Sequence, residues 1–209
     1  MVVNSFSRYM ITTIIFDLSE VYLKGFCGVE DYLEDVLNMK SDEIRGKLQG
    51  PEFRLLMDGK ITEDEFWEKL IQRNEWDIEI SRFKEAIRNN FEEIDGTREI
   101  IEKLKDKNFK LGLLSDHSKE WVEYCNRKFD YHKLFHSIQY SFEVGCCKND
   151  KKTFELLLEK LDEEPQNCIF IDDHEKNTAV AKSIGLNTIH FKNPEQLKKE
   201  LTSFSIIID

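Results

Sequence analysis

Residues 12–23, TTIIFDLSEVYL, decide the fold and raise the main question about this chain. Thr12 to Phe16 form an apolar, β-branched run that is typical of a buried strand. The run ends at a single carboxylate, Asp17, and the next polar side chain is only a serine, Ser19. In parallel α/β sheets, ligands bind beyond the carboxyl ends of the strands. The stretch therefore predicts a functional group at Asp17.

Further apolar runs of strand length follow along the chain, with helical patterns between them. The runs occupy residues 110–116, 136–141, 167–173 and 187–191. The helical patterns occupy residues 97–108, 151–161, 175–185 and 194–201. Strands that alternate with helices and are almost entirely apolar are typical of a parallel sheet covered on both faces. We therefore predict an α/β fold with a Rossmann-like, three-layer core. The last residues, SFSIIID (203–209), are compatible with an edge strand or a loose tail.

The stretch between the first two strands has a different character. It shows no convincing strand, and its patterns predict a series of short amphipathic helices. Thr62 and Glu65 have the spacing of a capping box at the start of one helix. We predict that residues 1–22 and 95–209 form the α/β core domain, and that residues 23–94 form an all-helical cap.

The composition restricts the classes of partner. The formal net charge is −11, and an acidic surface repels nucleic acid and anionic lipid, so we expect no nucleic acid and no membrane as partners. No apolar stretch approaches the length of a membrane span, and the N-terminus lacks a secretory leader, so we expect a cytoplasmic protein. Five cysteines without a CxxC motif predict reduced thiols. The sequence is compatible with a monomer or a homodimer.

Polar side chains follow three of the predicted strands at the points where the strands end. They are Asp17, Ser115, Asp116, Asp172 and Asp173. Because the carboxyl ends of parallel strands meet at one edge of the sheet, we expect these groups to converge, together with Lys148. One carboxylate at a strand end is often only a turn former. Three strand ends and a lysine form a much more specific set.

This set of side chains is suited to phosphoryl chemistry. Asp17, with Asp172 or Asp173, offers the hard oxygen ligands that suit Mg²⁺. Lys148 and the hydroxyl of Ser115 can hold phosphate oxygens. A carboxylate such as Asp17, beside a metal ion and a lysine, can attack phosphorus and form an aspartyl-phosphate.

The motifs that carry these residues have a recognisable order. They are FDLSEV (16–21), LLSD (113–116), VGCCK (144–148), IFIDDHEKN (169–177) and GLNTIHF (185–191). With them the sequence resembles the haloacid dehalogenase superfamily, in the branch with a helical cap inserted after the first motif (subfamily IA-like), and it is similar to the sugar-phosphate phosphatases of that branch. The resemblance covers most of residues 12–191, whereas the cap matches only by its position and helicity.

The resemblance implies a role for each matched residue. Asp17 matches the nucleophile. The metal ligands match Asp17, the main-chain carbonyl of Ser19 and a carboxylate of the fourth motif, for which Asp172 is the first choice and Asp173 the second.

The remaining matches concern the phosphoryl group. Ser115 matches the hydroxyl that binds it, and Lys148 matches the lysine that balances its charge. We place Asp116 with these two residues in the predicted phosphate-binding set. Asn177 falls where the branch often has a structural asparagine, and it is equally compatible with a local hydrogen bond or a substrate contact.

Two residues depart from the family pattern. The lysine is usually followed by proline, and here Asn149, another good turn former, takes that place. More seriously, phosphatases of the superfamily usually have a second aspartate where this chain has Ser19. Serine keeps the main-chain carbonyl but cannot act as an acid or base near neutral pH, a function that typically contributes about 10²–10⁴-fold. We therefore expect slow turnover of alkyl phosphates and less handicap with acyl, aryl or anomeric sugar phosphates.

Three other residues are candidates for the missing acid and base. Glu20 is adjacent, but its side chain should point away if the extended geometry continues. His117 and His174 follow the second and fourth strands, and His titrates in a suitable range. A lone His at the start of a loop is more often a surface residue.

We therefore predict a Mg²⁺-dependent phosphoric monoester hydrolase that acts on a small phosphorylated metabolite. Its specificity is expected in the cap loops 24–30 and 56–62. One alternative is a catalytically weak or inactive protein that binds phosphate or a partner, with cap aromatics such as Phe66, Trp67, Trp76 and Phe83 as a binding face rather than a core. A less favoured alternative is a haloacid dehalogenase, which typically lacks the paired acids Asp172 and Asp173.

Overall fold

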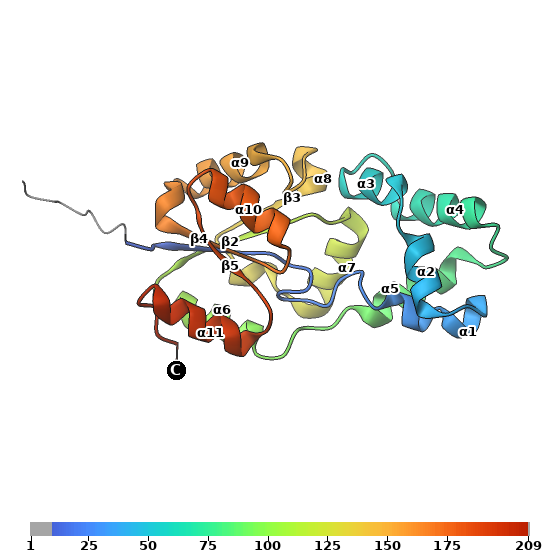
Figure 1. Ribbon diagram of the computed structural model, residues 1–209, viewed down its shortest axis with the longest axis horizontal. Helices are drawn as coiled ribbons and strands as arrows, with labels where there is room; N and C mark the ends of the chain where they lie inside the picture. The colour runs from blue at the N-terminus through green and yellow to red at the C-terminus, as the bar shows by residue number, and fades with distance from the viewer. Residues whose placement is uncertain (1–9, 209) are drawn as a thin grey trace, which may run out of the picture.

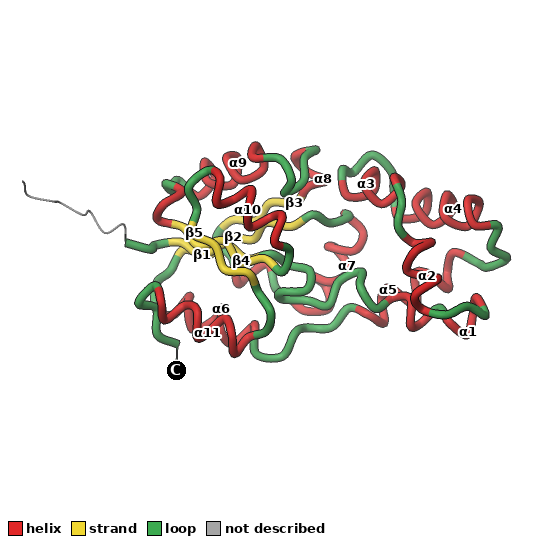
Figure 2. The backbone as a smooth tube through the Cα atoms, viewed as in Figure 1, coloured by secondary structure: helices red, strands yellow, loops and turns green. Residues whose placement is uncertain are grey.

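The sheet at the centre of the protein is built as the sequence predicts. The computed structural model describes residues 10–208 of the chain. Five strands form one parallel sheet in the order β3-β2-β1-β4-β5. The strands are β1 (Thr13–Phe16), β2 (Lys110–Ser115), β3 (Ser137–Tyr140), β4 (Cys168–Asp172) and β5 (Asn187–His190). The first strand therefore lies in the middle of the sheet (Figure 1, Figure 2).

Helices cover both faces of the sheet, because successive residues of a strand point to opposite faces. Ile14 and Phe16 share a hydrophobic core with α6, α7 and α11, whereas Ile15 packs with α9 and α10. These helices are α6 (Thr97–Asp106), α7 (Lys119–Phe129), α9 (Lys151–Leu161), α10 (Glu175–Ser183) and α11 (Pro194–Ser203). Figure 1 shows α9 and α10 above the sheet and α6 and α11 below it. The predicted three-layer, Rossmann-like α/β core is confirmed.

The stretch between β1 and α6 is helical, as its patterns predict, and lies to one side of the sheet (Figure 1). Its elements are η1 (Val29–Tyr32), α1 (Glu34–Leu37), α2 (Ser41–Leu48), α3 (Pro51–Met57), α4 (Glu63–Asn74) and α5 (Ile80–Asn90). Thr62 and Glu65 form both hydrogen bonds of the predicted capping box. We call residues 23–94 the cap, and the exact division between cap and core stays a prediction. Between residues 10 and 208, no helix is both long and apolar enough to cross a membrane.

Two helices and the C-terminal stretch differ from the sequence analysis. It did not identify α7 or the short α8 (Ser141–Val144), which follow β2 and β3, although Ser118 caps α7 as its residue type would allow. Residues 204–208 form neither the edge strand nor the loose tail that we considered. The chain turns at Ser205, whose φ is 64°, and buries Ile206 and Ile208 against the core.

Candidate active site

The parallel register brings the predicted strand ends together. Phe16 lies opposite both Leu113 and Ile171, and the main-chain N–H of Asp17 donates to the carbonyl of Ile171 at 2.9 Å. The chain therefore leaves the middle of the sheet at Asp17, level with the end of β4.

Lys148 joins the two strand ends through a buried ion-pair cluster. Its Nζ lies 2.6 Å from Asp17 Oδ2 and 2.7 Å from Asp172 Oδ2. All three side chains are almost fully buried. The segment 145–150 that carries the lysine precedes α9, so the sheet and this loop together position one ammonium group between two carboxylates.

A third carboxylate completes a set of oxygen donors. Asp17, Asp172 and Asp173 each offer an oxygen atom that lies within 4.8 Å of the other two. Hard carboxylate oxygens are what Mg²⁺ prefers. One ammonium group, from Lys148, faces three carboxylates, so a divalent cation would also reduce the excess of negative charge. The donor set therefore fits a magnesium ion. Ser19 lies two residues after Asp17, where it forms a bridge with Leu23, and the metal role of its carbonyl stays a prediction.

The ionisation of these groups reflects burial and mutual repulsion. Burial raises the pKa of Asp17. The Lys148 ammonium opposes this rise, and the negative charges of Asp172 and Asp173 add to it. Burial and the charge of Asp172 likewise raise the pKa of Asp173. Burial alone would lower the pKa of Lys148, but the carboxylates of Asp17 and Asp172 outweigh burial and raise it. The cluster therefore holds one positive charge, on Lys148, beside carboxylates whose combined negative charge it does not neutralise.

Ser115 and Asp116 lie beside this cluster in different states. The Ser115 hydroxyl is fully buried and has no hydrogen-bond partner between residues 10 and 208. Such an orphaned group is rare in folded proteins and fits a position that contacts a ligand. Asp116 accepts two hydrogen bonds from the main-chain N–H of Lys148, at 3.0 and 3.2 Å. Asp116 thus fixes the backbone of the lysine, and its predicted contact with phosphate stays a prediction.

Asn177 makes a local contact that the sequence left open. Its amide Nδ2 donates to both oxygens of Asp172, at 3.1 and 3.2 Å, and the main-chain N–H of His174 donates to Asp172 Oδ1 at 2.8 Å. These bonds orient the carboxylate that faces Lys148. Asn177 is therefore a positioning residue for Asp172.

The three candidates for the missing acid and base have distinct environments. The expected extended geometry does not continue through Glu20, whose φ is 59°; the chain turns there, and Glu20 Oε1 accepts a bond from the N–H of Gly25 at 2.8 Å. His117 is buried, and burial lowers its pKa to about 4, so its imidazole is neutral at pH 7. His174 is exposed. The premise that made Glu20 point away is therefore wrong.

Comparison with known proteins assigns the chain to a family. A model of haloacid dehalogenase-like hydrolases matches residues 14–191, which include every motif at the strand ends. The chain belongs to this family.

Two curated relatives of the chain are named as hydrolases of phosphorylated compounds. The chain is 27% identical over 133 residues to flavin mononucleotide hydrolase 1 of Arabidopsis thaliana, with 62% of this chain and 53% of the relative covered. It is 28% identical over 108 residues to a phosphorylated carbohydrates phosphatase of Thermotoga maritima, with 52% and 48% covered. The chain thus spans about half the length of these curated relatives.

The fold is also that of solved family members. A family enzyme from Bacteroides thetaiotaomicron, crystallised with magnesium and inorganic phosphate, superimposes with a TM-score of 0.75 at 20% identity, covering 88% of this chain and 95% of the other. At this identity the likeness concerns the fold alone.

In this haloacid dehalogenase-like chain, the end of α3 and the loop after it dock on the segment that carries Lys148. Ser141 Oγ donates to the carbonyl of Met57 at 2.5 Å, and Cys147 Sγ donates to Asp58 Oδ1 at 3.3 Å. Gly59 has a φ of 69°, and a Cβ there would come within 3.0 Å of the Phe142 carbonyl. The close approach requires glycine. The predicted specificity loop 56–62 therefore contacts the core directly.

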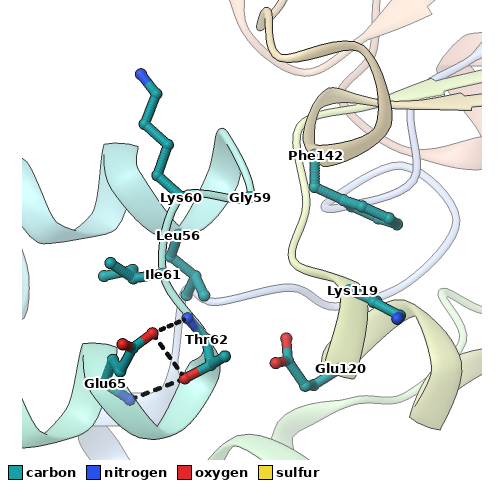
Figure 3. A pocket seen from close by; sticks show the side chains of 9 residues that line it. All are labelled: Leu56, Gly59, Lys60, Ile61, Thr62, Glu65, Lys119, Glu120 and Phe142. Carbon is teal, nitrogen blue, oxygen red and sulfur yellow. Dashed lines mark hydrogen bonds between the residues drawn. The ribbon is translucent and has the colours of Figure 1, made fainter.

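Figure 3 shows a pocket of about 320 Å³ between this loop and the core. Residues 59–62 form one wall, and Lys119, Glu120 and Phe142 form the other (Figure 3). Its four charged side chains already have partners in the chain. The pairs are Lys60 with Asp58, Lys119 with Glu123, Glu65 with Thr62, and Glu120 with the N–H of Glu63. The pocket lacks the unpaired groups of the strand-end cluster, so the cluster is the stronger candidate for chemistry.

The cap aromatics form a core rather than an exposed face. Phe66, Trp67 and Phe83 are fully buried, and Trp76 packs partly buried against them. Trp67 and Phe83 stack with ring centroids 4.8 Å apart. These four residues therefore stabilise the cap, as expected for aromatics at helical spacing.

Proposed function

We propose that this protein is a Mg²⁺-dependent phosphatase that acts on a small phosphorylated metabolite through an aspartyl-phosphate at Asp17. The buried cluster around Lys148 is the observation that supports this proposal most strongly. It holds a nucleophilic carboxylate, a fixed cation and three oxygen donors within a few ångströms. The orphaned Ser115 hydroxyl adds a hydrogen-bond donor that has no partner among residues 10–208. A purely structural cluster has no physical need for this combination.

Each residue has a defined task in this mechanism. A Mg²⁺ ion held by Asp17, Asp172 and Asp173 would neutralise phosphoryl oxygens. Lys148 places a positive charge beside Asp17, which opposes the rise in the pKa of that carboxyl group and stabilises the negative charge of the transferring group. The Ser115 hydroxyl donates to a phosphoryl oxygen, which satisfies a buried group that is otherwise unpaired.

The chemistry proceeds in two steps. An oxygen of Asp17 bonds to phosphorus, and the bond between phosphorus and the leaving oxygen breaks, with the electron pair departing on the leaving group. Water then attacks the aspartyl-phosphate, which releases inorganic phosphate and restores the carboxylate. Ser19 stands in place of the usual acid and does not protonate the leaving group near neutral pH. Substrates with stable leaving groups are therefore favoured.

Ser19 also supports a second candidate function. A protein that keeps the fold and the phosphate site but lacks the acid is suited to binding a phosphorylated compound without turnover. The dehalogenase alternative is disfavoured, because it gives no role to the three grouped carboxylates.

The first test is hydrolysis of p-nitrophenyl phosphate and acetyl phosphate, with Mg²⁺ and with EDTA. We expect Mg²⁺-dependent release of phosphate that is lost in Asp17→Asn. Thermal unfolding of the variant checks that it is folded. Absence of turnover on both activated substrates, in a folded protein that binds Mg²⁺, would support the binding function instead.

A further inference from the structure

Two phenylalanines meet at the boundary between cap and core. Phe26 lies in the predicted specificity loop 24–30, and Phe53 lies three residues before the other predicted loop, 56–62. Phe26 lies in the loop that follows β1, and Phe53 lies on α3. Their ring centroids are 5.0 Å apart, with the rings tilted by 45°. Unlike Phe66 and Trp67 of the same aromatic cluster, both are only partly buried. Each therefore keeps part of its surface available to another group.

Phe26 is fixed to the side of the site that contains Ser19. A Cβ on the preceding Gly25 would stand 2.8 Å from the Ser19 side chain and 3.2 Å from Glu20 Oε1. The side-chain amide of Asn90 donates to the carbonyls of Gly25 and Cys27, both at 2.8 Å. The backbone on both sides of Phe26 is therefore held, directly against the residue that lies two positions after Asp17.

Phe53 precedes a residue that contacts the segment of Lys148. The guanidinium of the adjacent Arg54 donates to Asn149 Oδ1 at 3.2 Å, and Asn149 follows Lys148 in the chain. Burial raises the pKa of Asp116, and the charges of Lys148 and Arg54 oppose that rise, which places Arg54 near the same strand end.

A chain neighbour of Phe26 therefore contacts Ser19, and a chain neighbour of Phe53 contacts Asn149, the residue after Lys148. Phe26 also stacks on Trp121, with centroids 5.5 Å apart and an interplanar angle of 16°. Trp121 in turn meets His117, the residue after Asp116, edge to face at 5.8 Å. Aromatic rings are thus available beside the proposed phosphoryl site, on the side of the cap.

We propose that Phe26 and Phe53 bind a planar aromatic group of the substrate, and that the substrate class is an aryl phosphate. This inference rests on the proposed function of the same site. An aryloxide leaves with the electron pair of its bond to phosphorus and takes its proton from water, so the net reaction yields a phenol and inorganic phosphate without an acid at position 19. Binding of the ring by Phe26 and Phe53, and the serine rather than an acid at position 19, both then suit an aryl phosphate.

The test separates ring binding from turnover. Phenylphosphonate and methylphosphonate, which cannot be hydrolysed at the P–C bond, are titrated calorimetrically into the full chain with Mg²⁺. We expect phenylphosphonate to bind about tenfold more tightly, as aromatic contacts of this kind contribute. In Phe26→Leu and Phe53→Leu we expect this preference to fall by about three- to tenfold. Phe83→Leu, a fully buried cap aromatic, is the matched control and should keep the preference.

Turnover provides the second measurement. Phe26→Leu and Phe53→Leu should lower kcat/KM for phenyl phosphate by about three- to tenfold and leave that for acetyl phosphate, which has no ring, within about twofold. Equal losses on both substrates, or an unchanged phenyl preference in both variants, would overturn the ring site. A wild-type protein that prefers phenylphosphonate but hydrolyses nothing would keep the ring site and reject the phosphatase. Turnover of acetyl phosphate by a wild-type protein that does not prefer phenylphosphonate would support the phosphatase and reject the ring site.

Discussion

Two of the places where the protein buries charge differ in how that charge is balanced. At the strand ends, the single ammonium of Lys148 faces Asp17 and Asp172, with a third carboxylate nearby. Inside the cap, Glu63 faces Arg88 in a pair of one acid and one base. Asp17, Lys148, Asp172 and Glu63 are almost fully buried, whereas Arg88 and Asp173 are only partly buried.

The partners of the two clusters differ more than their burial. Glu63 accepts hydrogen bonds from the Arg88 guanidinium at 2.8 Å, from Trp121 Nε1 at 2.7 Å and from Trp67 Nε1 at 3.3 Å, so its carboxylate is fully coordinated by the protein. At the strand ends negative charge is in excess and the Ser115 hydroxyl is orphaned. A balanced, satisfied cluster fixes geometry, because its members need nothing more. An unbalanced one is suited to a ligand that supplies the missing charge.

The sharpest test of this contrast removes the lysine. Lys148→Met should lower turnover of acetyl phosphate by about 10²–10³-fold or more, because the transferring group loses its fixed positive charge. It should also lower the free energy of unfolding by about 3–5 kcal/mol, since buried carboxylates lose their partner. Steady-state kinetics and urea unfolding measure both. Lys152→Met, at an exposed lysine, is the control. Full activity in Lys148→Met would remove the strand-end cluster as the active site.

The matching change in the cap should affect stability alone. Glu63→Gln removes the charge that pairs with Arg88 and should cost about 3–5 kcal/mol of unfolding free energy. Activity measured well below the melting temperature should stay within about twofold. Glu65→Gln, on the exposed face of the same helix, is expected to cost no more than about 1 kcal/mol. A loss of activity in folded Glu63→Gln would mean that the cap pair takes part in the chemistry.

His117 packs against Trp121, which donates to Glu63, and its burial makes the stability of the protein depend on pH. The folded protein holds it neutral with a pKa of about 4, whereas the unfolded chain protonates it near its ordinary value of about 6.5. The unfolded state therefore binds the extra proton as the pH falls from 6.5 to 4, and stability decreases in that window by about 3 kcal/mol. Chemical unfolding of wild type and His117→Gln at several pH values should show a smaller decrease in the variant. Parallel curves would contradict the assignment.

Substitution of Ser19 tests whether the absence of an acid at this position limits the rate at the strand-end site. Ser19→Asp restores an acid two residues after Asp17 and should raise kcat on alkyl phosphates by about 10–100-fold, and on aryl phosphates by less. In Ser19→Asn the side chain has the size of aspartate but no acidic group, so kcat should rise on neither alkyl nor aryl phosphates. Equal or lowered rates in Ser19→Asp would show that the proton comes from elsewhere.

The smallest expected effect is the change in unfolding free energy on substitution of Asp173, and it differs between the metal-free protein and the protein with Mg²⁺. Asp173→Asn should raise the unfolding free energy of the metal-free protein by less than about 1 kcal/mol, because it relieves repulsion from Asp172 at a position that is partly solvated. With Mg²⁺ present, the variant should gain less stability than wild type, since a ligand has been lost. Melting curves with and without Mg²⁺ decide this. A uniform loss of stability would mean that Asp173 is structural.

The strand and helix pattern could be predicted because its signals are local. TTIIFD ends at the residue where β1 ends, and helices such as Lys151–Leu161 follow the apolar spacing of their own residues. The strand-end set, Asp17, Ser115 and Asp172, followed from these strands because parallel pairing places their carboxyl ends at one edge. The sequence also placed Lys148 in the site as a group that can hold phosphate oxygens, and the family resemblance added its role in balancing charge.

Features that depend on backbone conformation or on distant partners were not predictable in this way. Glu20 was expected to continue an extended segment, whereas contacts with Gly25 accompany a left-handed turn there. The pairing of Glu63 with Trp121 joins residues 58 positions apart, and no local signal marks it.

The sequence by itself determined the five strands and the helices between them apart from α7 and α8, the residues at the strand ends and the missing acid at position 19. Tertiary structure alone decided which of those residues are satisfied. It paired Asp116 with the main-chain N–H of Lys148, left the Ser115 hydroxyl without a partner among the described residues 10–208, and brought Phe26 and Phe53 together from two separate segments. The reason is physical: residue type fixes which charges and hydrogen-bonding groups exist, but burial and distance, which only packing sets, decide which remain free to act.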